Sequence, residues 1–171
     1  PVRVRLFGED LVAFRDTSGK VGLIDKNCPH RRADLFFGRN EEGGLRCTYH
    51  GWKYDVEGKC VDMASEPSES NFKDKVRITA YPVSEAGGVL WTYMGPSDSQ
   101  PELPEMEFLR VPEDQRFVSW NIQASNFVQA IEGGIDSVHG NFLHSLLDRY
   151  RQDPSWQAKA KGGSMFERYY G

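Results

Sequence analysis

The chain begins with short runs in which hydrophobic and polar residues alternate with a period of two. The runs cover residues 2–6, 11–14 and 21–24, and glycine and aspartate residues separate them. Alternation of this kind, with turn residues at the breaks, is typical of β-hairpins. Further hairpins are expected at 52–59 and at 76–94, the latter with its turn at 84–88. The first ninety-odd residues are therefore predicted to be all-β.

The pattern changes after Gly95. Three prolines between 95 and 104 predict a linker, and the apolar residues of 116–123 suggest one strand. Beyond this strand, Ser125 or Asn126 could cap a helix. A helix is predicted because apolar residues then recur at helical spacing, at Phe127, Ile131, Ile135 and Val138. The pattern fades after about residue 150.

Composition limits the classes to which the protein can belong. Its 171 residues are 39% hydrophobic, enough for one ordinary core or one small domain plus part of another. A net charge of −4 without a basic stripe argues against nucleic acid or an anionic membrane as partner. Neither an apolar run of roughly 20 residues nor a signal peptide is evident, so we expect a cytoplasmic protein.

The chain holds three cysteines, an odd number that does not suggest a disulfide framework. Cys28-Pro29-His30 and Cys47-Thr48-Tyr49-His50 each place one cysteine beside one histidine. Cys28, His30, Cys47 and His50 together supply two ligands for each iron of a [2Fe–2S] cluster, with two histidines replacing two thiolates. Structural zinc sites prefer Cys-x-x-Cys and His-x₃₋₅-His spacings, so zinc is the weaker alternative and chance pairing the weakest.

Three residues near these pairs have other expected roles. Cys60 lies outside both loops, and we expect it to be a small buried apolar residue. Trp52 and Tyr54 either shield the cluster or serve only in strand packing, and the sequence does not decide between these alternatives.

A second group of candidate ligands lies at Asp136, His139 and His144. Two histidines and one carboxylate on one face of Fe(II) leave positions open for substrate and O₂. Asp136 and His139 are one helical turn apart, but His139 and His144 are five residues apart and would diverge on a continuous helix. Both histidines can bind one iron only if the helix ends or bulges between them, and Gly140 is the expected place.

With these residues the chain resembles the large subunits of Rieske non-haem iron ring-hydroxylating oxygenases, most closely the phthalate-dioxygenase type. The resemblance runs from residue 2 to slightly beyond His144. High-potential Rieske proteins carry an additional disulfide where this chain has Ala33 and Tyr49. The resemblance therefore implies a cluster near the lower end of the roughly −150 to +300 mV Rieske range.

The resemblance also assigns roles in the second group. His139 and His144 correspond to ligands of the mononuclear iron, and the third ligand of the family lies far downstream of residue 171. Asp136 corresponds to a residue that bridges His139 and a Rieske histidine of a neighbouring subunit, which would be His50 of the partner subunit. The sequence is accordingly expected to be an N-terminal fragment.

The resemblance implies an all-β Rieske domain at residues 1–100 and, at 101–171, the start of an α+β catalytic domain of the helix-grip type. The protein would take electrons from an NAD(P)H-dependent flavin and iron–sulfur reductase or a ferredoxin. It would use O₂ to hydroxylate or dealkylate an aromatic substrate, as a homotrimer or a multiple of one. The alternative is a Rieske ferredoxin, an electron carrier without catalysis of its own. A zinc-binding interaction module is a distant third.

Overall fold

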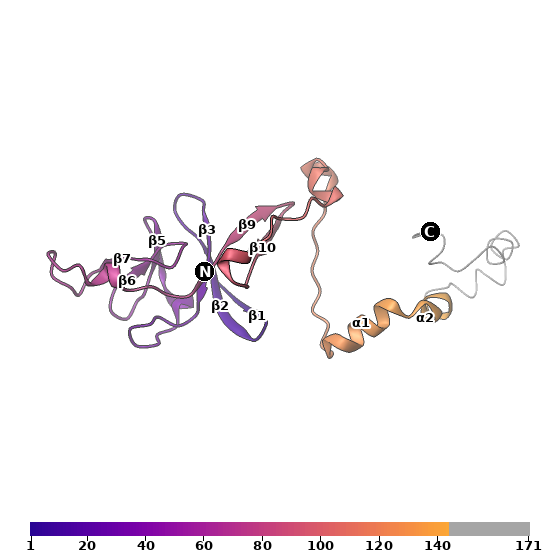
Figure 1. The fold of residues 1–171 in the computed structure, drawn as a ribbon, viewed down its shortest axis with the longest axis horizontal. Coiled ribbons are helices and arrows are strands. Elements are labelled where there is room, and N and C mark those ends of the chain that lie inside the picture. Colours follow the sequence, from indigo (N-terminus) through magenta and orange to yellow (C-terminus); the bar gives the residue numbers. More distant parts are fainter. Residues whose placement is uncertain (144–171) are drawn as a thin grey trace, which may run out of the picture. The chain divides into compact units, whose positions relative to one another are not determined.

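The computed structural model describes residues 1–143, and it divides the chain into two units, 1–118 and 119–171. Figure 1 shows that the first unit holds all the labelled strands and that the second contains the helices α1 and α2. The predicted Rieske-domain boundary near residue 100 stays a prediction.

The first sheet contains four antiparallel strands in the order β1–β2–β3–β8. They are β1 (Val2–Leu6), β2 (Glu9–Arg15), β3 (Val21–Asp25) and β8 (Ala80–Tyr81). Phe7 and Gly8 join β1 to β2, and both have positive φ angles, as a two-residue hairpin turn requires. The alternation in the sequence therefore predicted β1, β2 and β3 correctly.

The second sheet has the antiparallel order β4–β5–β6–β7. Its strands are β4 (Arg39–Glu41), β5 (Gly44–Arg46), β6 (Trp52–Tyr54) and β7 (Cys60–Met63). Trp52 and Tyr54 are buried on one face, whereas Lys53 between them lies on the other. The predicted hairpin at 52–59 is present as β6 and β7.

A third, two-stranded sheet pairs β9 (Val83–Ala86) with β10 (Val89–Thr92). The first strand of the predicted hairpin at 76–94 was expected to span residues 76–83, and this is wrong. Ile78 N–H donates to the Gly58 carbonyl, and residues 80–81 pair with β3 instead. Pro82 has no N–H to donate and stands between β8 and β9, so β9 begins at Val83 and includes residues expected in the turn.

Short 3₁₀ helices connect the strands and follow them. They are η1 (Leu35–Phe37), η2 (Phe72–Lys75), η3 (Ser97–Ser99), η4 (Glu107–Arg110) and η5 (Glu113–Gln115). Within the expected linker at 95–104, η3 is the one element that the structure contains. The predicted strand at 116–123 is wrong, since this described segment forms neither strand nor helix.

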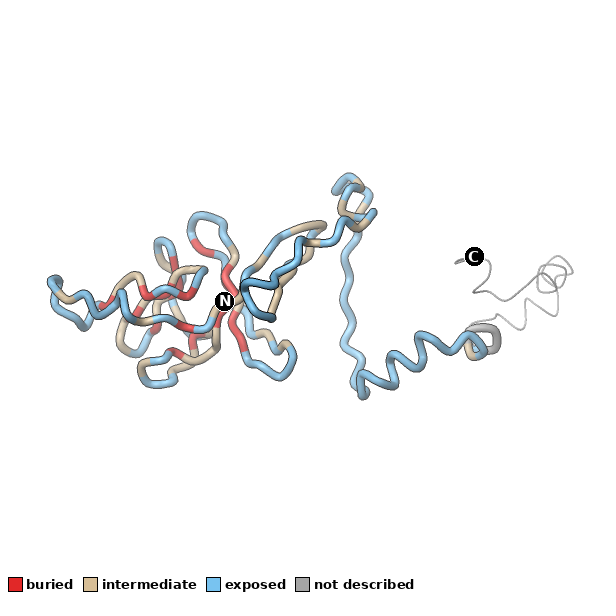
Figure 2. Tube along the Cα trace, in the orientation of Figure 1, coloured by how far each residue is buried: buried red, intermediate tan, exposed pale blue. Residues whose placement is uncertain are grey.

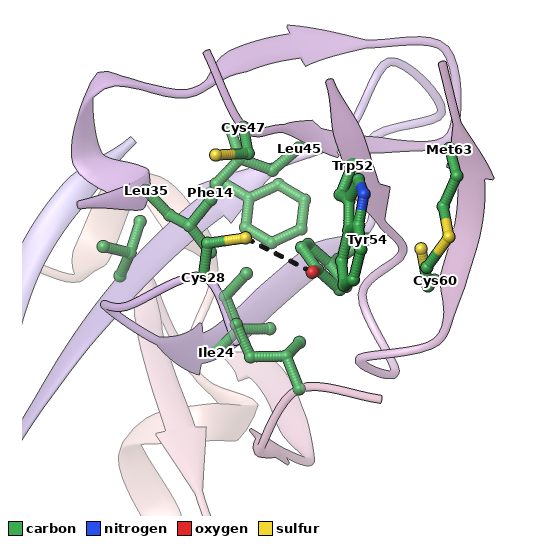
Figure 3. Packing of buried hydrophobic residues seen from close by; sticks show 12 residues of the cluster. Phe14, Ile24, Cys28, Leu35, Leu45, Cys47, Trp52, Tyr54, Cys60 and Met63 are labelled. Carbon is green, nitrogen blue, oxygen red and sulfur yellow. Dashed lines mark hydrogen bonds between the residues drawn. The ribbon is translucent and has the colours of Figure 1, made fainter. Parts of the chain in front are cut away.

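The core of the first unit is one cluster of buried side chains from the first two sheets and the loops between them. Its members are Val12, Phe14, Ile24, Cys28, Leu35, Leu45, Cys47, Trp52, Tyr54, Cys60, Met63 and Ile78. Figure 2 shows the buried residues within the β-rich part of the chain, and Figure 3 shows the cluster at close range. Cys60 is buried, as predicted.

In the second unit, α1 (Phe127–Ile135) and α2 (Ser137–Phe142) meet at Asp136. Asn126 caps α1 because its side chain accepts a hydrogen bond from Val128 N–H, as predicted. The expected break at Gly140 is wrong, since α2 runs through that residue to Phe142. The helix axis is interrupted earlier, at Asp136.

Candidate metal centre

Two loops of the first unit carry the four predicted cluster ligands. The first loop, residues 28–33, follows β3 and contains Cys28 and His30. The second loop, residues 47–52, follows β5 and contains Cys47 and His50. Each loop begins at its cysteine, and both cysteines are buried, with relative exposures of 1% and 3%.

The two loops have the same backbone hydrogen bonds. In the first, Cys28 N–H donates to the Ala33 carbonyl over 2.9 Å, and Arg32 N–H donates back to the Cys28 carbonyl over 2.8 Å. In the second, Cys47 N–H donates to the Trp52 carbonyl over 2.8 Å, and Gly51 N–H donates to the Cys47 carbonyl over 3.0 Å. The loops are therefore two copies of one backbone motif.

The fifth residue of each loop has a left-handed backbone conformation. Gly51 has φ +76°, which glycine adopts without steric cost, and Arg32 has φ 58° at the equivalent position. A Cβ on Gly51 would also lie 3.0 Å from the Ala64 Cβ atom. The second loop thus requires glycine for two reasons, whereas the first tolerates strain of about 1–2 kcal/mol at Arg32.

The imidazole rings of the two loops are in contact. The ring centroids of His30 and His50 are 4.4 Å apart, with an edge-to-face angle of 62°. Trp52 stacks on His30 at 4.5 Å and 7°, and Tyr49 lies against His50 at 3.9 Å. Aromatic packing therefore holds both rings in position.

The sulfur atoms lie in the core beside Tyr54. Figure 3 shows Cys28 and Cys47 at the Leu35 end of the cluster, with Cys60 and Met63 at the other end. The Tyr54 hydroxyl is in hydrogen-bond contact with Cys28 Sγ at 3.4 Å, and either atom can donate. Tyr54 thus packs in the strand and also contacts a candidate ligand.

Burial sets the protonation of these groups. It raises the pKa of the Cys28 thiol, and the nearby Cys47 raises it further. Burial likewise raises the pKa of Tyr54, and it lowers the pKa of His30, with the neighbouring His50 as a further cause. The surroundings therefore favour the neutral form of the His30 imidazole and of the Cys28 thiol.

The environment of the His30 Nδ1 atom tests most directly whether these residues fit a metal group. This atom is buried and has no hydrogen-bond partner within the described residues. A buried polar atom left unpaired costs about 1–3 kcal/mol, and a metal bound at the lone pair of a neutral imidazole would satisfy it. Two buried thiols and two adjacent imidazoles, carried by the two matching loops, are the donor types of a histidine-ligated [2Fe–2S] cluster.

The same residues do not resemble a site for one metal ion. Among residues 1–143, no three His, Cys, Asp or Glu side chains converge on a single metal position. A two-iron cluster does not require such convergence, since each iron takes only two ligands from the protein. The zinc alternative would need three or four ligands around one ion.

The second group of candidate ligands is only partly described. Asp136 caps α2 because its Oδ1 atom accepts from Val138 N–H and His139 N–H, and these hydrogen bonds lower its pKa. Its other oxygen lies 3.5 Å from His139 Nδ1. His144 lies outside the described residues. The helix end after Phe142 falls between the two histidines, two residues later than the predicted position at Gly140.

Sequence comparison identifies the first unit. Residues 1–82 match the family model for the Rieske [2Fe–2S] domain. These residues therefore form a Rieske domain. The match includes all four predicted ligands of the cluster, and the predicted all-β Rieske fold is confirmed.

Two proteins similar to this chain are oxygenase subunits. The 3-chlorobenzoate-3,4-dioxygenase oxygenase subunit of Comamonas testosteroni is 56% identical over 144 residues, which cover 84% of this chain and 33% of that protein. The phthalate 4,5-dioxygenase oxygenase subunit of Pseudomonas putida is 52% identical over 145 residues, covering 85% and 33%. The chain thus spans about a third of the length of these relatives, and the resemblance to the phthalate type is confirmed.

Solved structures agree with this relationship. Dicamba monooxygenase bound to 3,6-dichlorosalicylic acid aligns with a TM-score of 0.71 and 25% identity, covering 84% of this chain and 42% of that one. The complex between oxygenase and ferredoxin in carbazole 1,9a-dioxygenase aligns with a TM-score of 0.51 and 30% identity, covering 59% and 26%.

Arg46 is a further residue at this site that the sequence analysis did not single out. Its guanidinium contacts the second loop at the Gly51 carbonyl. A charged side chain directly before Cys47 was visible in the sequence, but its acceptors come from three separate segments. The sequence pattern therefore held no signal for this contact.

Proposed function

We propose that Cys28, His30, Cys47 and His50 hold a [2Fe–2S] cluster, as part of an oxygenase that acts on an aromatic substrate. The observation that carries this proposal is the pair of matching loops, each with a buried cysteine, whose two imidazoles are in contact and leave His30 Nδ1 unpaired. When bound, such a cluster accepts and releases single electrons. The names of the relatives favour an oxygenase component over a free electron carrier.

The residues of this chain have distinct roles in the proposal. Cys28 and Cys47 would bind as thiolates, and Tyr54 would then have to donate to Cys28 Sγ, because a thiolate has no proton to give. Trp52 holds the His30 ring by stacking on it and, with the core, excludes water. Both contacts restrict the geometry available to the ligands.

The first test uses the three cysteines, one of which provides a matched control. The wild-type chain, reconstituted with iron and sulfide, should bind two irons and two acid-labile sulfides. Cys28→Ala and Cys47→Ala should lose the bound iron, whereas Cys60→Ala, at an equally buried cysteine, should retain it. Iron and sulfide analysis measures this. Retention of full iron by Cys28→Ala would remove that residue from the ligand set.

The proposal for the whole protein adds a mononuclear Fe(II) bound by His139, His144 and a further ligand. Asp136 would link His139 to His50 of the partner subunit, one carboxylate oxygen serving each neighbour. The electrons would come from an NAD(P)H-dependent reductase or a ferredoxin, and the assembly would be a homotrimer or a multiple of one in the cytoplasm. The product would be a hydroxylated or dealkylated aromatic compound.

Asp136→Asn tests this electron path in the longer protein. Asparagine caps helices about as well as aspartate, so α2 should persist while the charge between the imidazoles is lost. Both iron sites should stay occupied, and single-turnover oxidation of the reduced protein by O₂ with substrate should slow by orders of magnitude. His139→Ala or His144→Ala should instead empty the mononuclear site.

Asn126→Ala is the control, because it removes the cap of α1 without touching Asp136. Oxidation of Asp136→Asn at the wild-type rate would show that the carboxylate is not on the path. Loss of the mononuclear iron from Asp136→Asn, but not from His139→Ala, would reverse the ligand assignment.

A further inference from the structure

Arg46, the last residue of β5, has an environment unlike that of the other arginines described as ion-paired. Its side chain is only 12% exposed, whereas the paired arginines at positions 3, 5, 15, 32, 39 and 110 are at least half exposed. Burial by itself would lower the pKa of Arg46, but the hydrogen bonds to Glu41 and Asp62 outweigh this and raise it. The guanidinium is therefore a charged group held away from water.

Each nitrogen of the Arg46 guanidinium has its own acceptor. Nε donates to Glu41 of β4 over 2.5 Å, and Nη2 lies 2.7 Å from the Asp62 carboxylate of β7. Nη1 donates to the Gly51 carbonyl over 2.5 Å. The rigid fork thus connects two strands of the second sheet to the loop that carries Cys47 and His50.

The register of the sheet explains how the Arg46 side chain reaches all three of its acceptors. Arg46 pairs with Lys53 and Lys53 pairs with Asp62, so these residues form a row across β5, β6 and β7 on the face opposite Tyr54. Two carboxylates on either side of the guanidinium fix its direction. The third donor then points to the Gly51 carbonyl, which belongs to the peptide unit between Gly51 and Trp52, one unit beyond the His50–Gly51 peptide.

We propose that Arg46 is a positioning residue that fixes the second ligand loop through the Gly51 carbonyl, with Glu41 and Asp62 as its anchors. The loop's own hydrogen bonds join Cys47 to Gly51 and Trp52 and leave this carbonyl to Arg46. The glycine conformation at Gly51 permits the backbone to turn, and Arg46 selects one orientation. That this orientation serves a metal group rests on the function proposed above.

Arg46→Lys tests the proposal because it keeps the charge but loses the three-way fork. Arg15→Lys is a matched control, since Arg15 also donates to a carboxylate, Glu85, and to a glycine carbonyl, at Gly19, outside both ligand loops. Amide hydrogen exchange is measured at Cys47 and Gly51 in the purified chain, both before and after reconstitution with iron and sulfide.

Exchange at the two loop amides of Arg46→Lys should be at least about tenfold faster than in the wild type, which corresponds to about 1.4 kcal/mol. Arg15→Lys should leave these amides unchanged. In the reconstituted protein, Arg46→Lys should also release iron to a chelator about tenfold faster. Equal exchange in the two variants would overturn the proposal, and so would an equal acceleration at β2 amides, which would indicate general destabilisation.

A second variant tests the same proposal if Arg46→Lys does not fold. Asp62→Asn removes one anchor without touching the loop, and it should accelerate exchange at Cys47 and Gly51 severalfold while β2 amides stay unchanged. No change at the loop amides would overturn the proposal. Exchange in the metal-free chain is read independently of the cluster, so failure of this inference and failure of the proposed function remain distinguishable.

Discussion

At the scale of single residues, Tyr54 is the side chain that links the packed core to the candidate cluster. It is fully buried, and its hydroxyl contacts Cys28 Sγ at 3.4 Å. Hydrogen bonds to the sulfur ligands of an iron–sulfur cluster stabilise the reduced state, in which the sulfur carries more negative charge. The hydroxyl should therefore raise the reduction potential.

Tyr54→Phe removes this hydroxyl and keeps the ring that fills the core. If loss of the hydrogen bond weakens the reduced state by about 0.5–1.5 kcal/mol more than the oxidised state, the reduction potential should fall by roughly 20–65 mV. Protein-film voltammetry measures the shift. Tyr93→Phe, which changes a half-buried tyrosine far along the chain from both loops, is the control and should leave the potential unchanged. An unchanged potential in Tyr54→Phe would show that the contact does not reach the cluster.

At the scale of elements, the turn between β2 and β3 depends on one buried carboxylate. Asp16 Oδ1 accepts hydrogen bonds from Ser18 N–H, the Ser18 hydroxyl and Lys20 N–H. The hydrogen bond from the Ser18 hydroxyl is the largest cause of a pKa below the ordinary value of 3.8. Since the lowered pKa favours the charged form in the folded state, its stabilising effect is complete above that ordinary value.

Asp16→Asn should remove this pH dependence. The free energy of unfolding of the wild type, relative to that of the variant, should be constant above pH 3.8 and should decrease as the pH falls through the lowered pKa. Urea unfolding at a series of pH values measures it. Parallel curves for the two proteins would show that Asp16 does not contribute to acid sensitivity.

The elements also show what the sequence could predict. The runs that became β1 to β3 alternate over several residues, and each pairs with its neighbour in the chain, so local pattern sufficed. The strands β4 and β5 have three residues each, too few for a visible period. The segment 116–123 has strand-like residues, but a strand needs a partner, and local sequence cannot show whether one exists.

For the candidate site, too, some features follow from local sequence and others depend on tertiary structure. Residue type and spacing predict Cys28, His30, Cys47 and His50 as ligands, because few metal groups take two cysteines and two histidines in this arrangement. The common hydrogen bonds of the loops, the left-handed Arg32 and the contacts of Arg46 depend on tertiary structure. No periodic pattern encodes them.

At the scale of the molecule, the two units differ in how far their described residues are buried. The first unit contains a core and a site formed within itself, whereas every residue of α1 is exposed in the structure. Among the described residues, no helix has the length and apolar character needed to cross a membrane. The chain covers about a third of the length of two similar oxygenase subunits, so the electron path through Asp136 remains a proposal.

The central claim is that two histidines and two cysteines of this chain bind a [2Fe–2S] cluster. The most direct test is the electron paramagnetic resonance spectrum of the reconstituted and reduced 171-residue protein. Histidine ligation of one iron predicts the rhombic signal with a low average g value that distinguishes such clusters from the all-cysteine kind. A spectrum of the all-cysteine kind would contradict the claim, as would a protein that holds stoichiometric zinc and gives no signal.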